Sequence, residues 1–172
     1  MDILKFISVL LLLFFFSCKR ITYTKKEDSF YGIHLKEWNS SICPKKVIYE
    51  RYQKKSNFFK KIKTDSNFEV RDCDSLYKPS NQRVFIPSVK FTGQIDYDIR
   101  LVIDDSIEYK ITSIDNKIDT VFYGGHPGDL TIMNNIRSLV VNGYKLDNSN
   151  TPLNIFIPTN LGKVIKKDKN KY

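Results

Sequence analysis

Two histidines and three cysteines are the residues of this chain most suited to catalysis or metal binding. One of them, His126, lies in the Gly-rich segment 124–129, where glycines would let the backbone approach a ligand closely and Asp129 could act with the imidazole. A ligand or catalytic loop here would use Tyr123, His126 and Asp129. A turn between two strands explains the same residues and is the favoured interpretation, because no phosphate-binding helix is expected after the glycines.

Common catalytic motifs are missing from the sequence. It contains no Gly-x-Ser-x-Gly elbow, no His-Glu-x-x-His helix, no Cys-x-x-Cys pair and no phosphate loop ending in Gly-Lys-Ser/Thr. The paired acids Asp104 and Asp105 are interpreted as turn formers, since successive strand residues face opposite sides of a sheet. We therefore expect no catalytic residue, no cofactor and no bound metal, and favour a protein that is not an enzyme.

The N-terminal segment concerns targeting. Lys5 precedes an apolar block at 6–16 that only Ser8 interrupts, and Lys19 and Arg20 follow shortly after it. The block holds about eleven residues, which suits the apolar region of a signal peptide, whereas a membrane-spanning helix needs about 20. Residues 1–17 are therefore predicted to be a signal peptide.

The end of this block places a small residue, Ser17, directly before Cys18. The pattern resembles the lipobox of bacterial lipoproteins, and the resemblance covers only the N-terminus. Phe15 and Phe16 depart from the commoner Leu-Ala/Ser form of this motif. The resemblance implies cleavage before Cys18 and attachment of fatty-acyl chains such as palmitate to that residue. Each buried methylene contributes about 0.8 kcal/mol, so two or three chains would anchor the protein permanently.

The residues after Cys18 bear on sorting. Positions 19–22 lack the Asp that retains many enteric lipoproteins in the inner membrane, and they lack the acidic cluster that resembles a surface-export signal in Bacteroidota. The abundance of Lys, Ile, Asn and Tyr is similar to that of proteins from AT-rich Bacteroidota genomes. The resemblance therefore implies an outer-membrane lipoprotein that faces the periplasm and contacts the membrane through the lipid on Cys18.

A modification pattern follows from the same resemblance. An Asp followed by Ser or Thr and an apolar residue resembles the periplasmic O-glycosylation site of that phylum, and it occurs at Ser75, Ser106 and Thr120. Ser106 should be the most exposed because it lies in a predicted turn, whereas Thr120 should lie within a strand.

With Cys18 assigned to lipid, Cys43 and Cys73 remain as an even pair in an oxidising compartment. A disulfide is the natural interpretation, and it would stabilise the fold by roughly 3 to 4 kcal/mol. The alternatives are two buried thiols, or a metal site shared with His34 and His126. Metal is the weakest alternative because no close Cys or His spacing preorganises it.

The chain has a net charge of +9, with a basic first half, an acidic centre and a basic tail. A basic surface can indicate nucleic acid, but a periplasmic lipoprotein rarely meets any, so we expect no nucleic-acid partner. Lysines and arginines next to the lipid could contact anionic head groups, although solvated lysines that keep the protein soluble explain the charge as well.

Strand patterns dominate the mature chain. Alternation of apolar and polar residues predicts a hairpin of 99–103 and 107–112, and a turn at Asp115 and Asn116 would lead into a third strand at 118–123. The pair Asn142 and Gly143 is the strongest short hairpin signal. A further strand is expected at 153–157.

Other segments are less decided. Segment 44–63 fits either a helix or, preferably, a strand at 46–52, and segment 130–137 fits a strand or a short helix. Segment 65–81 reads as a loop that contains Cys73. The fold class is therefore all-β leaning to α+β, as a small antiparallel β-sandwich or a sheet with at most one or two helices.

The predicted organisation is a signal peptide at 1–17, a lipid-anchored flexible tether at 18–29, a single β-rich domain at 30–162 and a disordered basic tail at 163–172. We expect a monomer that binds a protein partner in the envelope without catalysis, in its sharpest form an immunity-type inhibitor of a toxin. The alternatives are an envelope hydrolase or ligand-binding protein that uses the His126 loop, and a structural accessory subunit of an envelope complex.

Overall fold

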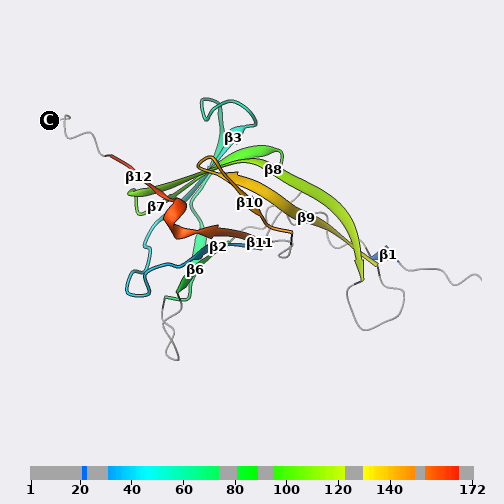
Figure 1. Ribbon diagram of the computed structural model, residues 1–172, viewed down its shortest axis with the longest axis horizontal. Coiled ribbons are helices and arrows are strands. Elements are labelled where there is room, and N and C mark those ends of the chain that lie inside the picture. The colour runs from blue at the N-terminus through cyan, green and yellow to red at the C-terminus, as the bar shows by residue number, and fades with distance from the viewer. Residues whose placement is uncertain are drawn as a thin grey trace, which may run out of the picture.

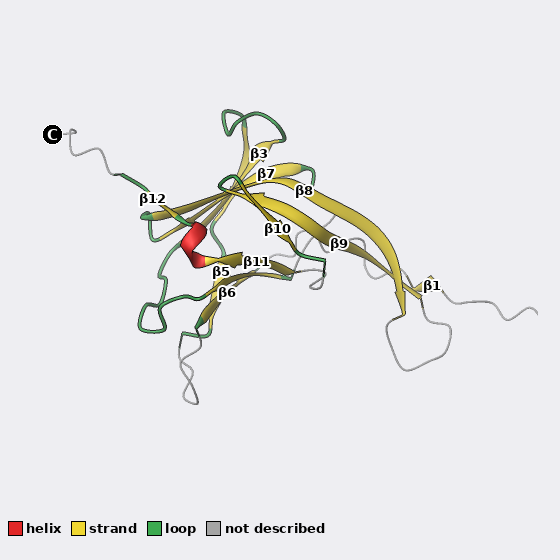
Figure 2. Cartoon of the chain, viewed as in Figure 1, coloured by secondary structure: helices red, strands yellow, loops and turns green. Residues whose placement is uncertain are grey.

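The structure, a computed structural model, describes residues 21–22, 31–73, 81–88, 95–122, 130–149 and 154–166. Nearly all regular structure in these residues is strand, arranged as a large curved sheet that covers a smaller one (Figures 1 and 2). The described residues contain a single short 3-10 helix, η1 (Thr159–Leu161). The all-β fold predicted from the sequence is confirmed.

Within the described residues, twelve strands form the two sheets. Except for the parallel pairs β1 with β9 and β2 with β11, neighbouring strands are antiparallel. The large sheet has the order β1 (Ile21–Thr22), β9 (Leu130–Val141), β8 (Ile107–Phe122), β7 (Tyr97–Ile103), β3 (Val47–Gln53) and β4 (Lys61–Asp65), with β10 (Tyr144–Asp147) on β9 and β12 (Lys163–Val164) on β8. The small sheet has the order β11 (Asn154–Pro158), β2 (Gly32–Lys36), β6 (Gln82–Pro87) and β5 (Phe68–Arg71).

The hydrophobic core lies between the sheets. Alternate residues of β7, namely Ile99, Leu101 and Ile103, are buried in it, while Arg100 lies on the opposite face. Burying such a side chain stabilises the fold by about 1.5–3 kcal/mol. Both sheets contribute to one cluster, whose other large members include Ile33, Leu35, Tyr49, Phe85, Tyr109, Ile111, Ile136, Leu139, Ile155 and Ile157.

Several strand predictions are confirmed. The hairpin of β7 and β8 pairs Ile103 with Ile107, and the preferred strand at 46–52 is β3. Asn142 has φ 49° and Gly143 has φ 95°, the two positive values that a type I′ turn between β9 and β10 requires. Segment 130–137 belongs to strand β9 and is not helical.

The turn predicted at Asp115 and Asn116 is wrong. Strand β8 runs through both residues, and the pairing with β9 absorbs the irregularity as register shifts between Thr112 and Asn116. Ser113 lies in this bulge with φ 51°. The long ladder with β9 outweighs the local turn preference of Asp and Asn, since every residue added to it gains paired backbone groups.

Three segment boundaries also differ from the predictions. The expected loop at 65–81 contains β5, because Phe68 and Val70 pack against the core. The expected disordered tail begins with β12, which pairs with Ile107 and Glu108 of β8. Within the expected tether, the backbone of β1 pairs with β9, while residues 23–30 and 167–172 lie outside the described part.

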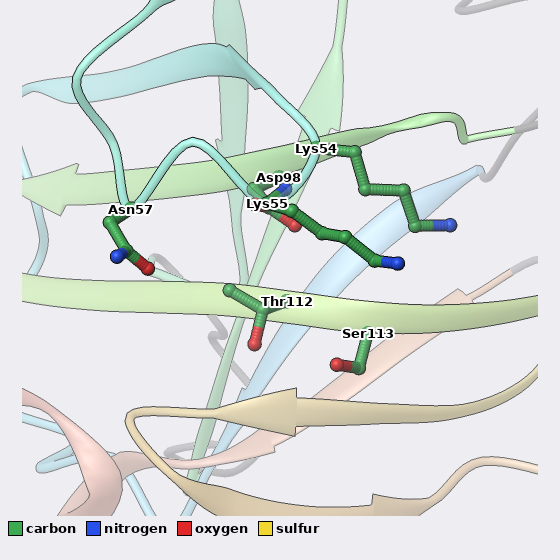
Figure 3. Close-up of a pocket in the computed structure, with 6 residues that line it drawn as sticks. All are labelled: Lys54, Lys55, Asn57, Asp98, Thr112 and Ser113. Atoms are coloured by element: carbon green, nitrogen blue, oxygen red, sulfur yellow. Dashed lines mark hydrogen bonds between the residues drawn. The ribbon is translucent and has the colours of Figure 1, made fainter.

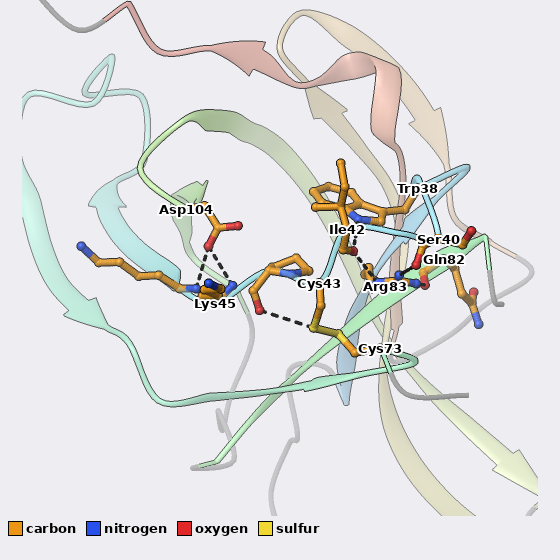
Figure 4. The surroundings of a disulfide bond; sticks show 11 residues. Trp38, Ser40, Ile42, Cys43, Lys45, Cys73, Gln82, Arg83 and Asp104 are labelled. Atoms are coloured by element: carbon orange, nitrogen blue, oxygen red, sulfur yellow. Dashed lines mark hydrogen bonds between the residues drawn. A yellow bond between two sulfur atoms is a disulfide. The ribbon is translucent and has the colours of Figure 1, made fainter. Parts of the chain in front are cut away.

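The predicted disulfide between Cys43 and Cys73 is present, with their Cα atoms 5.3 Å apart (Figure 4). It joins the segment before β3 of the large sheet to the end of β5 of the small sheet. Beside it, the buried guanidinium of Arg83 donates hydrogen bonds to backbone carbonyl oxygens of Ser40 at 2.6 Å, Ile42 at 3.1 Å and Gln82 at 2.7 Å. The cross-link and these bonds hold the connection between the two sheets in place.

Candidate binding site

More than half of the sequence-predicted site residues fall outside the part of the chain that the structure describes. Cys18, Ser75, Tyr123, His126 and Asp129 lie outside the described residues. The backbone of Thr120 lies in β8 opposite Ile132, as expected of a strand residue. Ser106 is exposed in the turn between β7 and β8, where its hydroxyl donates to the carbonyl oxygen of Ile103 at 3.2 Å.

His34 lies on the outer face of the small sheet and stacks on Phe156, with ring centroids 4.4 Å apart. Its Nε2 lies 3.3 Å from the side-chain oxygen of Asn154. Burial lowers the pKa of His34, and this outweighs the hydrogen bond to Asn154, which alone would raise it. The imidazole therefore favours its neutral form. Among the described residues, no group of three Cys, His or acidic side chains could hold a metal ion.

A different feature stands out on the outer face of the large sheet, namely the loop 54–60 between β3 and β4, called here the β3–β4 loop. Its ends are joined by a hydrogen bond from Gln53 N to Lys60 O at 2.8 Å, and Lys55 N donates to the carboxylate of Asp98 at 2.9 Å. Lys55, Asn57 and Phe58 have φ between 50° and 64°. A bulky residue at positive φ is strained, so the surrounding contacts must hold this loop in one shape.

The two neighbouring phenylalanines of the loop have opposite environments. Phe58 packs onto the sheet, with its ring centroid 5.2 Å from that of Tyr52 and 5.3 Å from Nζ of Lys110. Phe59 is 87% exposed, and Ile62 on the adjoining strand β4 is 61% exposed. The fold thus holds one aromatic ring as an internal support and presents the other to solvent.

Beneath the loop, an ion-pair network crosses β3, β7 and β8. Glu50, only 6% exposed, accepts hydrogen bonds from Tyr52, from Lys61 and from Arg100, and Arg100 also donates to Glu108 at 2.8 Å. Burial by itself would raise the pKa of Glu50, but the three donors outweigh it and the pKa is lowered. These acids are thereby already paired within the protein.

The lysines of the loop differ from those of the network. No carboxylate of the described residues pairs with the ammonium group of Lys54, Lys55 or Lys60, which we call the lysine cluster. All three residues are exposed. The cluster therefore leaves positive charge free for an external anion.

A pocket of about 280 Å³ lies between the loop and the sheet (Figure 3). Asp98, 4% exposed, comes from β7, and its carboxylate fixes the loop through Lys55 N. Lys54 and Lys55 extend in the same direction from the loop in Figure 3. The complete lining consists of Lys54, Lys55, Asn57, Asp98, Thr112 and Ser113. The ammonium, carboxylate, amide and hydroxyl groups of this lining can bind a polar or charged ligand.

The sequence alone did not predict this site, because the pattern of 44–63 indicated only a choice between helix and strand. The available signal was the run 54–61, in which two phenylalanines stand between pairs of lysines. An apolar pair enclosed by charges at the tip of a loop indicates a contact surface, because a core residue is seldom placed there.

Comparisons with protein-family models, with curated proteins and with solved structures find no match for this chain. In the part of the chain that the structure describes, no helix is long and apolar enough to cross a membrane.

Proposed function

We propose that this protein is a lipid-anchored envelope protein whose β-sandwich binds another protein and performs no catalysis. The lipid on Cys18 holds it in the outer membrane, facing the periplasm, as the resemblance to bacterial lipoproteins implies. The single observation that supports protein binding is the β3–β4 loop, which exposes Phe59 next to the lysine cluster. Aromatic residues surrounded by polar groups are typical anchors of protein interfaces.

The shape of the loop supports the same proposal. Its hydrogen bonds and its packing through Phe58 order the backbone before any partner arrives, so less conformational entropy is lost on binding. An immunity-type inhibitor is the sharpest form of this function, because an ordered loop on a membrane-anchored domain could block a toxin before it reaches its target.

The anchor is tested by metabolic labelling with a palmitate analogue. The wild-type protein should carry the label and sediment with membranes, whereas Cys18→Ser should lose both properties. Labelling that persists in Cys18→Ser would contradict lipidation at this residue.

Protein binding is tested by cross-linking in intact envelopes, followed by purification of this protein and mass spectrometry. Phe59→Ala should reduce recovery of the specific partner, whereas Tyr144→Ala is a matched control that removes another exposed aromatic ring, on β10. Equal recovery with both variants would move the interface away from the loop. Recovery of this protein alone would refute protein binding.

A further inference from the structure

The pocket between the β3–β4 loop and the sheet indicates the chemistry of the partner, if the protein-binding function proposed above holds. We infer that the partner is an acidic protein and that one of its Asp or Glu carboxylates enters the pocket between the β3–β4 loop and the sheet, with Phe59 packing beside it. The loop, the pocket and the lysine cluster thus form one docking surface.

The charges of the pocket match a single carboxylate. Lys54 and Lys55 contribute two positive charges and Asp98 one negative charge, so the lining carries a net charge of one positive unit. A carboxylate supplies one negative charge, whereas a phosphate group carries nearly two at neutral pH and would be brought close to Asp98. The hydroxyls of Thr112 and Ser113 and the amide of Asn57 can donate hydrogen bonds to the same carboxylate.

The pocket is also preorganised for this ligand. The carboxylate of Asp98 holds Lys55 N, while the acids of the neighbouring network, Glu50 and Glu108, are paired with Arg100. An entering carboxylate therefore meets free ammonium groups without breaking an existing ion pair of the described residues. Such complementarity favours rapid and selective association.

The position of the anchor distinguishes a protein partner from the membrane itself. Thr112 and Ser113 of the pocket lie in the middle of β8. Strand β1 pairs with the residue of β9 that lies opposite Phe122, at the end of β8. At roughly 3.3 Å per residue, the pocket and β1 are up to about 30 Å apart along β8. Figure 1 shows β1 at the far end of the β8–β9 arm, away from β3. Cys18 precedes β1 by three residues, so the length of the chain allows at most about 10 Å between the Cα atom that would bear the proposed lipid and Ile21. The loop is therefore available to a partner outside the bilayer.

Carbodiimide cross-linking of wild-type protein in its native envelope tests this inference and identifies the partner in the same experiment. The reagent activates a carboxyl group, which then forms an amide with a lysine amine in direct contact. Mass spectrometry should find Lys54 or Lys55 joined to an Asp or Glu of another protein. The identified partner is then purified for affinity measurements.

The lysine pairs at the two ends of β3 supply matched variants. Lys54→Glu/Lys55→Glu should weaken binding of the partner by about tenfold or more, because the reversed charges repel its carboxylate. Lys45→Glu/Lys46→Glu makes the same change in charge before the start of β3 and should leave the affinity nearly unchanged, although it also removes the exposed ion pair of Lys46 with Asp105. Thermal unfolding midpoints of both variants close to that of the wild type would show that neither has lost its fold.

Each other outcome has a defined meaning. A partner that binds both variants equally, or that cross-links only through lysines elsewhere, overturns the carboxylate pocket but leaves the proposed function intact. Recovery of no protein at all overturns both. If the Cys18→Ser protein sediments with phosphatidylglycerol vesicles and only the added change Lys54→Glu/Lys55→Glu abolishes this, without an effect on binding of any protein, the inference is overturned in favour of anionic lipid.

Discussion

Removal of the disulfide between Cys43 and Cys73 should destabilise the domain by an amount that its loop length determines. The bond closes a loop with a sequence separation of 30 residues that contains β3, β4 and β5. For such a loop, the loss of chain entropy in the unfolded state amounts to roughly 3 to 4 kcal/mol at 25 °C. Cys43 is exposed and Cys73 is partly exposed, so replacing both by alanine removes little buried surface. Nearly all of the effect should therefore come from the cross-link.

Urea unfolding of the oxidised wild type and of Cys43→Ala/Cys73→Ala, purified in the same detergent, measures this difference. Trp38, the only tryptophan, is buried beside the disulfide and reports on the native packing through its fluorescence. With a slope of about 2 kcal/mol per M urea, the midpoint should fall by roughly 1.5 to 2 M. Far-UV circular dichroism should give the same transition if unfolding is two-state.

Reduction provides an internal control. Reductant should lower the midpoint of the wild type to that of the double variant and should leave the variant unchanged. A loss of stability below about 1 kcal/mol in the double variant would refute the reasoning, because it would mean that the unfolded chain is not restrained as the chain-entropy model requires.

Three further predictions concern buried or strained groups. Because the pKa of Glu50 is lowered, its paired carboxylate stabilises the fold above its ordinary pKa of 4.5, and this stabilisation is lost as the pH falls below that value. Glu50→Gln should therefore flatten the pH dependence of the unfolding free energy, measured with urea, in this acidic range. An unchanged pH dependence would contradict the paired state. Gly143→Ala should cost about 1 kcal/mol in unfolding free energy, because Gly143 has φ 95°, and a neutral effect would argue against the type I′ turn. Arg83→Lys should lower the free energy of unfolding by about 1–3 kcal/mol, since one ammonium group cannot reproduce the guanidinium, which donates to three backbone carbonyl oxygens. Thermal unfolding measures this loss, and a variant as stable as the wild type would show that those oxygens find other donors.

Local sequence patterns predicted much of the strand layout. The alternation through Ile99, Leu101 and Ile103 reflects burial of one sheet face, and the pair Asn142 and Gly143 is one of the few that accept two positive φ values. Such features depend only on neighbouring residues, and so does the targeting pattern that ends at Cys18, which remains a prediction. The disulfide was also accessible, because an even pair of cysteines follows once Cys18 is assigned to lipid.

The sequence by itself therefore determined that the chain is rich in strands, where several turns fall and which cysteines can pair. Only the tertiary structure decided that Asp115 lies within a bulged strand, because that outcome depends on pairing with β9. It alone also assembled the pocket, whose residues Lys54, Asp98 and Thr112 are far apart in the chain. They meet because β3, β7 and β8 are neighbours in one sheet, and strand order is set by long-range packing, which local residue preferences do not encode.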